Sequence, residues 1–225
     1  MPRGRRERIA VIGGSEETVA QMVNRAKAVN SERVVLVGPD IASDDGGTMS
    51  AVFAAAAVAA VIAGNTDPSV PINGAELTLF GAAGKRLSDN EIDQLVRGGV
   101  TPIETVGGVS SPVRGITTKT SSGGAADTTW RELTTILIVD EVIPTIRSAL
   151  RTRFARSKNT AQSRGAIRSQ VVLELEEMKS REIVDSYGEV LVSALKSDPT
   201  VCLVEFSFTV AHGLNRIYLT AHITV

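Results

Sequence analysis

The residues best suited to hold a phosphate group lie in a glycine turn near the start of the chain. Gly13, Gly14 and Ser15 follow a short apolar run and precede a helical pattern. Backbone N–H groups and the positive end of a helix could hold a nucleotide phosphate at such a turn. The turn lacks the full dinucleotide-binding fingerprint and the lysine of a P-loop. Because any tight strand-to-helix turn favours Gly and an N-cap Ser, we predict a structural turn, with a nucleotide-binding α/β enzyme as the alternative.

Two further groups of side chains have the chemistry of metal ligands. The acidic loop Asp40–Asp45 precedes a glycine pair, but its spacing does not match a calcium-binding loop. Cys202, His212 and His222 are soft ligands, yet a tetrahedral zinc site would need a fourth protein ligand of the usual type. No serine lies in a GxSxG elbow. We therefore predict no catalytic residue, no cofactor and no metal site.

Composition and charge favour a soluble globular protein that is able to bury a core. The 225 residues carry a formal net charge of -1, which gives no electrostatic reason to expect nucleic acid as a partner. The single cysteine cannot form an internal disulfide. The Ala-rich segment Met49–Gly64 is shorter than the roughly 20 residues that a bilayer core requires. We predict neither nucleic-acid binding nor membrane insertion.

The elements that must position these residues divide into two predicted domains, the first over residues 1–124. Its pattern alternates strands and helices: strand Arg8–Ile12, helix Glu16–Val29, strand Arg33–Val37 and a buried helix over Met49–Gly64, whose small side chains include Ala51, Ala55, Ala59 and Ala63. This order predicts a βαβ-type unit with a parallel strand pair. A further helix begins after Ser88, with Glu91 in the capping-box position, and ends at Gly98-Gly99. Short β-prone pieces follow over Val100–Thr118, and Ser121–Gly124 is the predicted boundary loop.

The second predicted domain covers residues 125–225 and combines helices with an antiparallel sheet. It begins with a β-prone run, Trp130–Val139, followed by helices over Glu141–Phe154 and Ala166–Arg181. In the second helix an apolar face is predicted to meet the core through Val171, Val172, Leu175 and Met178. The fold class predicted for the whole chain is α/β plus α+β, ending in a hairpin.

The predicted hairpin covers Val201–Val225 and ends inside a strand. Apolar and polar residues alternate from Val204 to Val210 and again from Arg216 to Val225, around a turn at Ala211–Asn215. A terminal strand without Pro or central charge presents unpaired backbone groups that another chain could pair. We therefore expect this strand to form a contact with another subunit.

Several of these segments, in their order, carry a resemblance to a known family. They are Ala63–Pro71, Leu87–Ile92 with Gly98–Pro102, Val113–Thr118 and the closing Val204–Val225. Together they resemble the C-terminal half of contractile phage tail sheath proteins, which are related to the sheaths of phage-tail-like contractile machines. The specificity lies in the order of the segments, and sheath proteins are usually longer, with an N-terminal arm and an outer domain.

The resemblance implies a structural subunit without enzymatic activity. Such a subunit polymerises with neighbouring sheath subunits around a tail tube and contracts to drive the tube through the host envelope. Its further partners would be the baseplate or tail terminator, and its location the virion tail, or the host cytoplasm during assembly. A small adaptor of a tail or secretion-like machine remains an alternative. The implied subunit interface comprises Arg216, Ile217, Tyr218, Leu219, Thr220, Ala221, His222, Ile223, Thr224 and Val225. The implied tube contact comprises Glu174, Glu176, Glu177 and Lys179, with a solvated helix face as the alternative from sequence.

Overall fold

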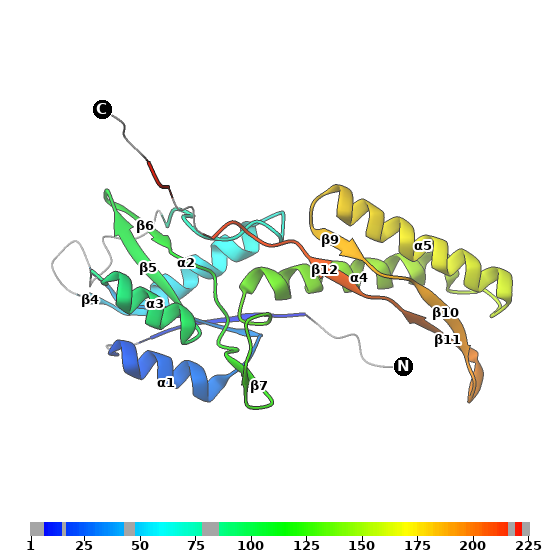
Figure 1. The fold of residues 1–225 in the computed structure, drawn as a ribbon, viewed down its shortest axis with the longest axis horizontal. Coiled ribbons are helices and arrows are strands. Elements are labelled where there is room, and N and C mark those ends of the chain that lie inside the picture. Colours follow the sequence, from blue (N-terminus) through cyan, green and yellow to red (C-terminus); the bar gives the residue numbers. More distant parts are fainter. Residues whose placement is uncertain (1–6, 15–16, 43–47, 78–85, 216–218, 222–225) are drawn as a thin grey trace. The chain divides into compact units, whose positions relative to one another are not determined.

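The computed structural model describes residues 7–14, 17–42, 48–77, 86–215 and 219–221, and Figure 1 shows their arrangement. The chain forms two compact units. The first contains Met1–Thr66, Val70–Ile136 and Gly213–Val225, and the second contains Asp67–Ser69 and Leu137–His212. The mixture of helices and strands confirms the predicted fold class.

The first unit is built on a four-stranded sheet with the order β1-β2-β5-β6. Its strands are β1 (Ala10–Gly13), β2 (Val34–Gly38), β5 (Val100–Val106) and β6 (Val109–Pro112). The pairs β1/β2 and β2/β5 are parallel, whereas β6 is antiparallel to β5. The predicted βαβ unit with its parallel pair is therefore confirmed. A short antiparallel pair joins β3 (Ile41–Ala42) to β4 (Thr48–Met49).

Three helices cover the sheet of the first unit: α1 (Val19–Val29), α2 (Ala51–Gly64) and α3 (Asp89–Arg97). Leu36 of the central strand packs in one cluster with residues of α1 and α3. Because side chains alternate along a strand, the buried neighbours Val35 and Val37 point to the other face, where α2 packs. The sheet is thus covered on both faces, as expected for parallel strands.

Local capping sets where the helices of the first unit begin. Ser88 accepts a hydrogen bond from the Glu91 backbone N–H, and the Glu91 side chain accepts one from the Ser88 N–H at 2.9 Å. The predicted capping box is therefore confirmed. Thr18 and Gln21 form a second box at the start of α1. These reciprocal bonds satisfy N–H groups that have no partner inside the helix.

Helix α2 is buried along one face, which confirms the prediction, although the face differs from the predicted one by part of a turn. Ala51, Ala54, Ala55 and Val58 are buried, Ala59 is half-buried and Ala63 is exposed. Small side chains let this helix approach the sheet closely. The opposite side of its first turn exposes Val52 and Phe53.

The segment Ser121–Gly124 is a hairpin rather than a linker between compact units. It joins β7 (Ser121–Ser122) to β8 (Ala125–Ala126) through Gly123 and Gly124, which both have positive φ. The Asn30 carboxamide oxygen accepts hydrogen bonds from the Thr120 and Ser121 N–H groups, which attaches the hairpin to the end of α1. The compact units divide after Ile136, and residues 213–215 again belong to the first unit. A domain boundary at Gly124 stays a prediction.

Helix α4 (Leu133–Phe154) begins in the first unit and belongs to the second from Leu137 onward. The second unit also contains α5 (Ala161–Ser180) and four strands. Strands β9 (Val184–Tyr187) and β12 (Phe208–Val210) form one antiparallel pair, and β10 (Leu191–Leu195) and β11 (Asp198–Glu205) form another. The core includes Ile138, Val142 and Ile146 of α4 with Val171, Leu175 and Met178 of α5. The core face predicted for the second helix is confirmed, with Val172 partly buried beside it.

The strand predicted over Trp130–Val139 is wrong, because this segment belongs largely to α4. Its β-branched residues favour a strand by intrinsic propensity. The buried positions Ile138, Val142 and Ile146 recur every four residues, however, which is the spacing of one helix face. Burial against α5 outweighs local propensity here.

The hairpin predicted over Val201–Val225 is also not formed as predicted in the described residues. Val204 pairs with Val192 of β10, and Phe208 pairs with Tyr187 of β9, so the first predicted strand is shared between two earlier partners. The hairpin that does form is β10–β11, one strand earlier in the chain. Residues 219–221 are not in a strand, and residues 216–218 and 222–225 lie outside the described residues.

Candidate functional site

The glycine turn after β1 is built as a close packing contact. A Cβ atom on Gly13 would lie 2.4 Å from the Ala51 carbonyl carbon, so only glycine lets β1 pass the start of α2. Gly14 is buried, and its N–H donates to the Val37 carbonyl oxygen at 2.9 Å. The N–H that a phosphate would need is therefore already occupied. Ser15 lies outside the described residues.

The start of α1 is likewise occupied by groups of the chain itself. Thr18 Oγ1 accepts from the Gln21 N–H at 3.3 Å, and Gln21 Oε1 accepts from the Thr18 N–H at 2.8 Å. The carboxylate of Glu17 stands near Gly14 and forms an ion pair of 2.9 Å with Arg25. The two charges offset one another, so the ion pair leaves no net positive charge at the turn to attract an anionic ligand. The geometry supports the structural interpretation of the turn.

The candidate metal ligands do not come together in the described residues. Asp40 Oδ1 accepts from the Ala51 N–H at 2.9 Å, at the start of α2. His212 is exposed, and Cys202 is partly buried in β11. Among the residues that the structure describes, no three His, Cys, Asp or Glu side chains are placed to hold a metal ion. Asp44, Asp45 and His222 lie outside them.

No helix within the described ranges is both long enough and apolar enough to span a bilayer. The Ala-rich α2 is buried in the first unit along one face, through Ala51, Ala54 and Ala55. Its apolar character is used in packing.

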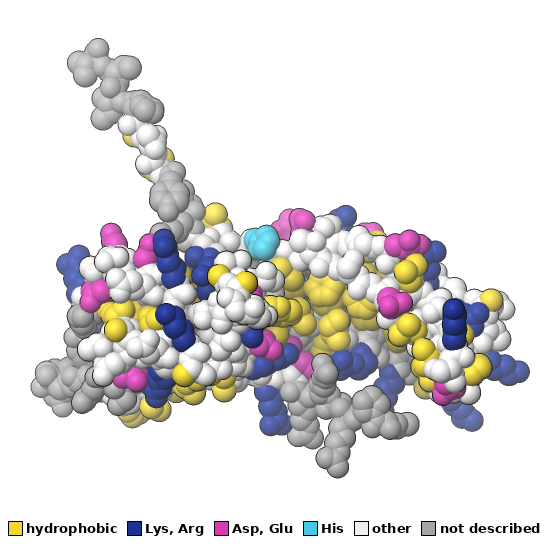
Figure 2. All heavy atoms as spheres, turned by 60° about the horizontal axis from the view of Figure 1, so that its bottom comes forward, with side chains coloured by type: hydrophobic (Ala, Val, Ile, Leu, Met, Phe, Trp, Pro, Cys, Tyr) yellow, Lys and Arg dark blue, Asp and Glu magenta, His cyan; other side chains and the backbone are white. Residues whose placement is uncertain are grey.

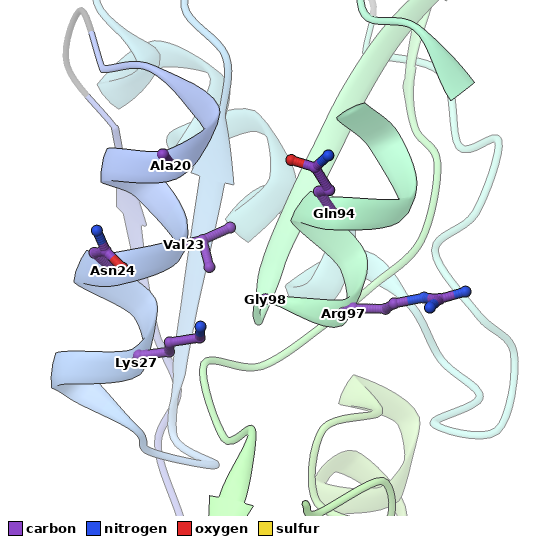
Figure 3. Close-up of a pocket in the computed structure, with 7 residues that line it drawn as sticks. All are labelled: Ala20, Val23, Asn24, Lys27, Gln94, Arg97 and Gly98. Atoms are coloured by element: carbon purple, nitrogen blue, oxygen red, sulfur yellow. The ribbon is translucent and has the colours of Figure 1, made fainter. Parts of the chain in front are cut away.

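A groove of about 380 Å³ lies between α1 and α3 (Figure 3). It forms where Val23 packs beside Gly98, at which a Cβ atom would lie 2.5 Å from the Val23 Cγ2. Lys27 extends between the two helices, whereas Arg97 points away from the groove. The lining contains two cations, two amides and no carboxylate, and comprises Ala20, Val23, Asn24, Lys27, Gln94, Arg97 and Gly98. Lys27 is the cation that faces the groove, since Arg97 points away and lies 3.6 Å from Asp93, and the lining offers no acid–base pair.

The four residues predicted to face a tail tube lie on α5 and differ in their surroundings. Glu174 Oε1 accepts from Gln170 Nε2 at 2.6 Å, and Glu176 accepts from the Tyr187 hydroxyl. The bond to Glu176 raises the pKa of Tyr187 above its ordinary value, because it stabilises the protonated phenol. Glu177 and Lys179 are exposed. Two of the four side chains are therefore engaged within the unit.

The predicted subunit interface is described only at Leu219, Thr220 and Ala221. All three residues are exposed, and Leu219 is 91% exposed. The preceding segment is held to the first unit, where Asn73 Nδ2 donates to the Asn215 carboxamide oxygen at 2.7 Å. Arg216–Tyr218 and His222–Val225 lie outside the described residues. The role of this segment in assembly stays a prediction.

Sequence reasoning missed the surface of the β10–β11 hairpin. Cross-strand pairs Val192/Val204 and Ala194/Cys202 form its less exposed face. The other face exposes Leu191, Leu195, Val201 and Leu203. The signal was present as alternation on both sides of the polar turn Lys196-Ser197-Asp198. The sequence prediction instead begins its hairpin at Val201 and pairs that strand with residues further along the chain.

The sequence comparisons find tail sheath proteins. Residues 125–224 match the family described as phage tail sheath C-terminal domain. The tail sheath protein of Bacillus phage SP01 is 29% identical over 226 residues, which cover 98% of this chain. The chain spans 38% of the length of that relative.

Solved structures of sheath proteins share the fold. The sheath of an extracellular contractile injection system (PVC), in its contracted state, has a TM-score of 0.69 at 14% identity and covers 95% of this chain and 63% of its own. The sheath tail protein of Listeria innocua has a TM-score of 0.67 at 13% identity, with 89% and 56% covered. That of Desulfitobacterium hafniense has a TM-score of 0.65 at 15% identity, with 82% and 47% covered. The resemblance seen in the sequence is confirmed, because residues 125–224 match the phage tail sheath C-terminal domain family and the similar solved structures are sheath proteins.

Proposed function

We propose that this chain acts as a structural subunit of a contractile phage tail sheath. In this role it polymerises around the tail tube and contracts to drive the tube through the host envelope. The observation that carries the proposal is the family match of residues 125–224, joined to a fold similar to that of a contracted sheath over 95% of the chain. Contraction of such an array needs no bound nucleotide if two lattice packings differ in energy.

The proposal includes the absence of a catalytic role. The matched family is one of structural proteins, which supports a role without catalysis. The occupied Gly14 N–H and the capping box of Thr18 and Gln21 at the start of α1 argue against the nucleotide-binding alternative. A nucleotide would have to displace bonds that the fold already makes.

Neighbouring sheath subunits are the proposed partners of the C-terminal segment Arg216–Val225. Exposure of Leu219–Ala221 supports this, because these residues are free to pair with another chain. Both sheets of the second unit have two strands among the described residues, so each strand keeps one unpaired edge there. An extended segment that adds to such an edge gains a full row of backbone hydrogen bonds.

The tail tube is the proposed partner of the exposed face of α5. Of Glu174, Glu176, Glu177 and Lys179, the last two have exposed side chains available to a partner. The baseplate or tail terminator would contact the ends of the array. We further propose that the protein resides in the virion tail, after assembly in the host cytoplasm.

Electron microscopy of the natural gene product tests the main proposal. We expect purified protein to form hollow striated cylinders, alone or on added tail tubes. Discrete particles that bind ATP, GTP or NAD, and that never form cylinders, would favour the enzyme alternative. Cylinders that do not bind tail tubes when these are added would favour a different assembly role.

The tube contact has a separate test. Glu177→Lys should weaken cosedimentation with purified tubes at low salt, because the exchange reverses an exposed charge without touching the core. Glu76→Lys is a matched control, since Glu76 is an exposed acid of the first unit. Equal binding by the two variants and the unmodified protein would remove α5 from the tube contact.

A further inference from the structure

A side-chain bridge holds the chain to the first unit just before the C-terminal segment Arg216–Val225. Asn73 Nδ2 donates to the Asn215 carboxamide oxygen at 2.7 Å, and the two residues are 142 positions apart in sequence. Both side chains are partly buried. Within the described ranges, Asn215 makes no other side-chain hydrogen bond. The bridge is therefore the one contact that its carboxamide serves there.

The loop that carries Asn73 is itself fixed to the first unit. Asn73 Oδ1 accepts from the Gly115 N–H at 3.2 Å. Because this N–H can only donate, it keeps the amide oxygen on its side and directs the amide nitrogen toward Asn215. Ile72 is buried, and a Cβ atom on Gly115 would lie 2.8 Å from the Ile72 Cγ1. Asn73 is therefore a firmly held point of attachment.

The backbone beside the bridge packs against the same loop. A Cβ atom on Gly213 would lie 3.0, 3.1 and 3.2 Å from the Cγ, Cδ and Cβ atoms of Pro71. A proline ring cannot turn away as a long side chain can, so the absence of a Cβ atom lets the chain pass. Leu214, between the two contacts, is 71% exposed. Residues 213 and 215 thus both hold the chain to the loop of residues 71–73.

The chain is attached differently on the two sides of this bridge. On the preceding side, the Ala211 N–H donates to the Ile183 carbonyl oxygen at 3.2 Å within the second unit. On the following side, Leu219–Ala221 are exposed and belong to no strand. In Figures 1 and 2 these three residues lie clear of the other described residues. Among the described residues, the bridge is the last attachment before the C-terminal segment.

The position of this attachment decides how far the C-terminal segment can reach. An extended chain spans at most about 3.3–3.6 Å per residue, so the ten residues Arg216–Val225 reach about 33–36 Å from Asn215. A chain released back to Ala211 would reach about 46–50 Å with fourteen residues, and from a different origin. A shorter tether raises the effective concentration of the segment at the strand edges within its reach and excludes edges beyond it.

We propose that Asn73 is a positioning residue for assembly, because it anchors Asn215 and thereby fixes the origin and the reach of the C-terminal segment. The segment then meets a restricted set of strand edges on neighbouring subunits. Fixing the origin in advance also reduces the entropy that is lost when the segment pairs. This inference rests on the proposed function for the identity of the partner, whereas the anchor is a property of the single chain.

Trypsin tests the anchor in the unassembled chain, because it cleaves after arginine and Arg216 directly follows Asn215. A protease needs a locally released chain, so the rate of this cleavage follows the opening of the anchor. Asn215→Ala removes the acceptor and should speed formation of the product that ends at Arg216 about two- to tenfold, as expected for one hydrogen bond. Dividing each rate by that of a synthetic peptide with the same local sequence removes the effect of the exchange on trypsin itself.

Two further variants separate the hydrogen bond from the change of sequence. Asn215→Asp keeps an acceptor oxygen for Asn73 and should be cleaved at about the unmodified normalised rate. Leu214→Ala shortens the neighbouring exposed side chain and should also leave the rate unchanged. Trp130 fluorescence during urea unfolding should give the same global stability for all variants, so that differences in cleavage report local opening.

Electron microscopy of the natural gene product tests the positioning role. At equal protein concentration, Asn215→Ala should leave a smaller fraction of the protein in cylinders, and Asn215→Asp should restore the unmodified fraction. Equal normalised cleavage of the unmodified and Asn215→Ala chains would overturn the anchor. Faster cleavage with a normal yield of cylinders would also overturn the proposal, since the bridge would then only stabilise the first unit. If the unmodified protein forms no cylinders while the cleavage contrast holds, the sheath role and the positioning role both fail and the anchor alone stands.

Discussion

Gly13 offers a direct test of whether the glycine turn is a packing device or a ligand site. Replacing it with alanine places a Cβ atom 2.4 Å from the Ala51 carbonyl carbon and 2.5 Å from the Val52 nitrogen. Both atoms belong to the backbone at the start of α2, so no side chain can move aside. Gly14→Ala is the matched control, because its nearest atoms are the flexible ends of Glu17 and Met22 at 3.3 and 3.4 Å.

The two exchanges should differ in free energy of unfolding. Overpacking typically costs about 1–3 kcal/mol, and a rigid backbone neighbour places Gly13→Ala in the upper part of that range. Alanine also lowers the conformational entropy of the unfolded chain, which stabilises either variant by about 0.4–1 kcal/mol. We therefore expect Gly13→Ala to destabilise by about 2 kcal/mol, and Gly14→Ala to change stability by less than about 0.5 kcal/mol.

Fluorescence of Trp130 during urea unfolding supplies the assay. This residue is the single tryptophan and lies in the first unit, so its signal follows the unit that contains the turn. For a domain of this size, about 1 kcal/mol corresponds to a melting shift of about 2–4 °C, which gives an independent thermal measurement. Equal stabilities for the two variants would refute the close approach of β1 to α2. Equal stabilities together with a lost nucleotide-induced melting shift would favour the ligand interpretation.

Four further predictions concern other parts of the molecule. ATP, GTP and NAD should leave the melting temperature unchanged, and a saturable shift at micromolar ligand would contradict the structural interpretation of the turn. Ala55→Leu should destabilise the first unit by about 1–3 kcal/mol, whereas Ala56→Leu on the exposed face should not, as urea unfolding can measure. In a Tyr218→Phe background, which leaves Tyr187 as the single tyrosine, Glu176→Gln should lower the pKa of Tyr187 in a spectroscopic titration. The Tyr187–Glu176 hydrogen bond should stabilise the fold below the ordinary tyrosine pKa, and this stabilisation should be lost as the pH rises through the raised pKa of Tyr187. Thr220→Pro and Ala221→Pro, made separately, should include at least one folded variant that forms no cylinders under the electron microscope, and normal cylinders from both would contradict the interface assigned to this segment.

The first unit was the more predictable part of the fold, because its signals are local. Strand β2 is an uninterrupted apolar run, and Ser88 with Glu91 specifies a helix start within four residues. Parallel pairing then follows from the crossover helices, which leave few topologies open. What could not be predicted was which alanines of α2 face the sheet. An all-apolar helix has no polar side to orient it.

The second unit was less predictable because its hydrophobic pattern fits both the two-residue period of a strand and the longer period of a helix. The β-branched residues near the start of α4 satisfy a strand pattern over a short window, while the four-residue spacing of Ile138, Val142 and Ile146 appears only over a longer one. Its strands also pair with strands that are distant in sequence, as β9 does with β12. Alternation identifies a strand, but it does not identify the strand with which it pairs.

The same limit governs the candidate site. The sequence pattern predicts that Val204–Val210 pair with a strand further along the chain. In the structure Val204 pairs with Val192 of β10, and Phe208 pairs with Tyr187 of β9. Residues 216–218 and 222–225 lie outside the described residues, so the pairing of the segment beyond Arg216 stays a prediction. An alternating segment without a partner in its own unit either stays unpaired or pairs with another chain. The corrected pairing of Val204–Val210 is therefore compatible with the proposed contact between Arg216–Val225 and another subunit. The open question is which unpaired strand edge binds this segment.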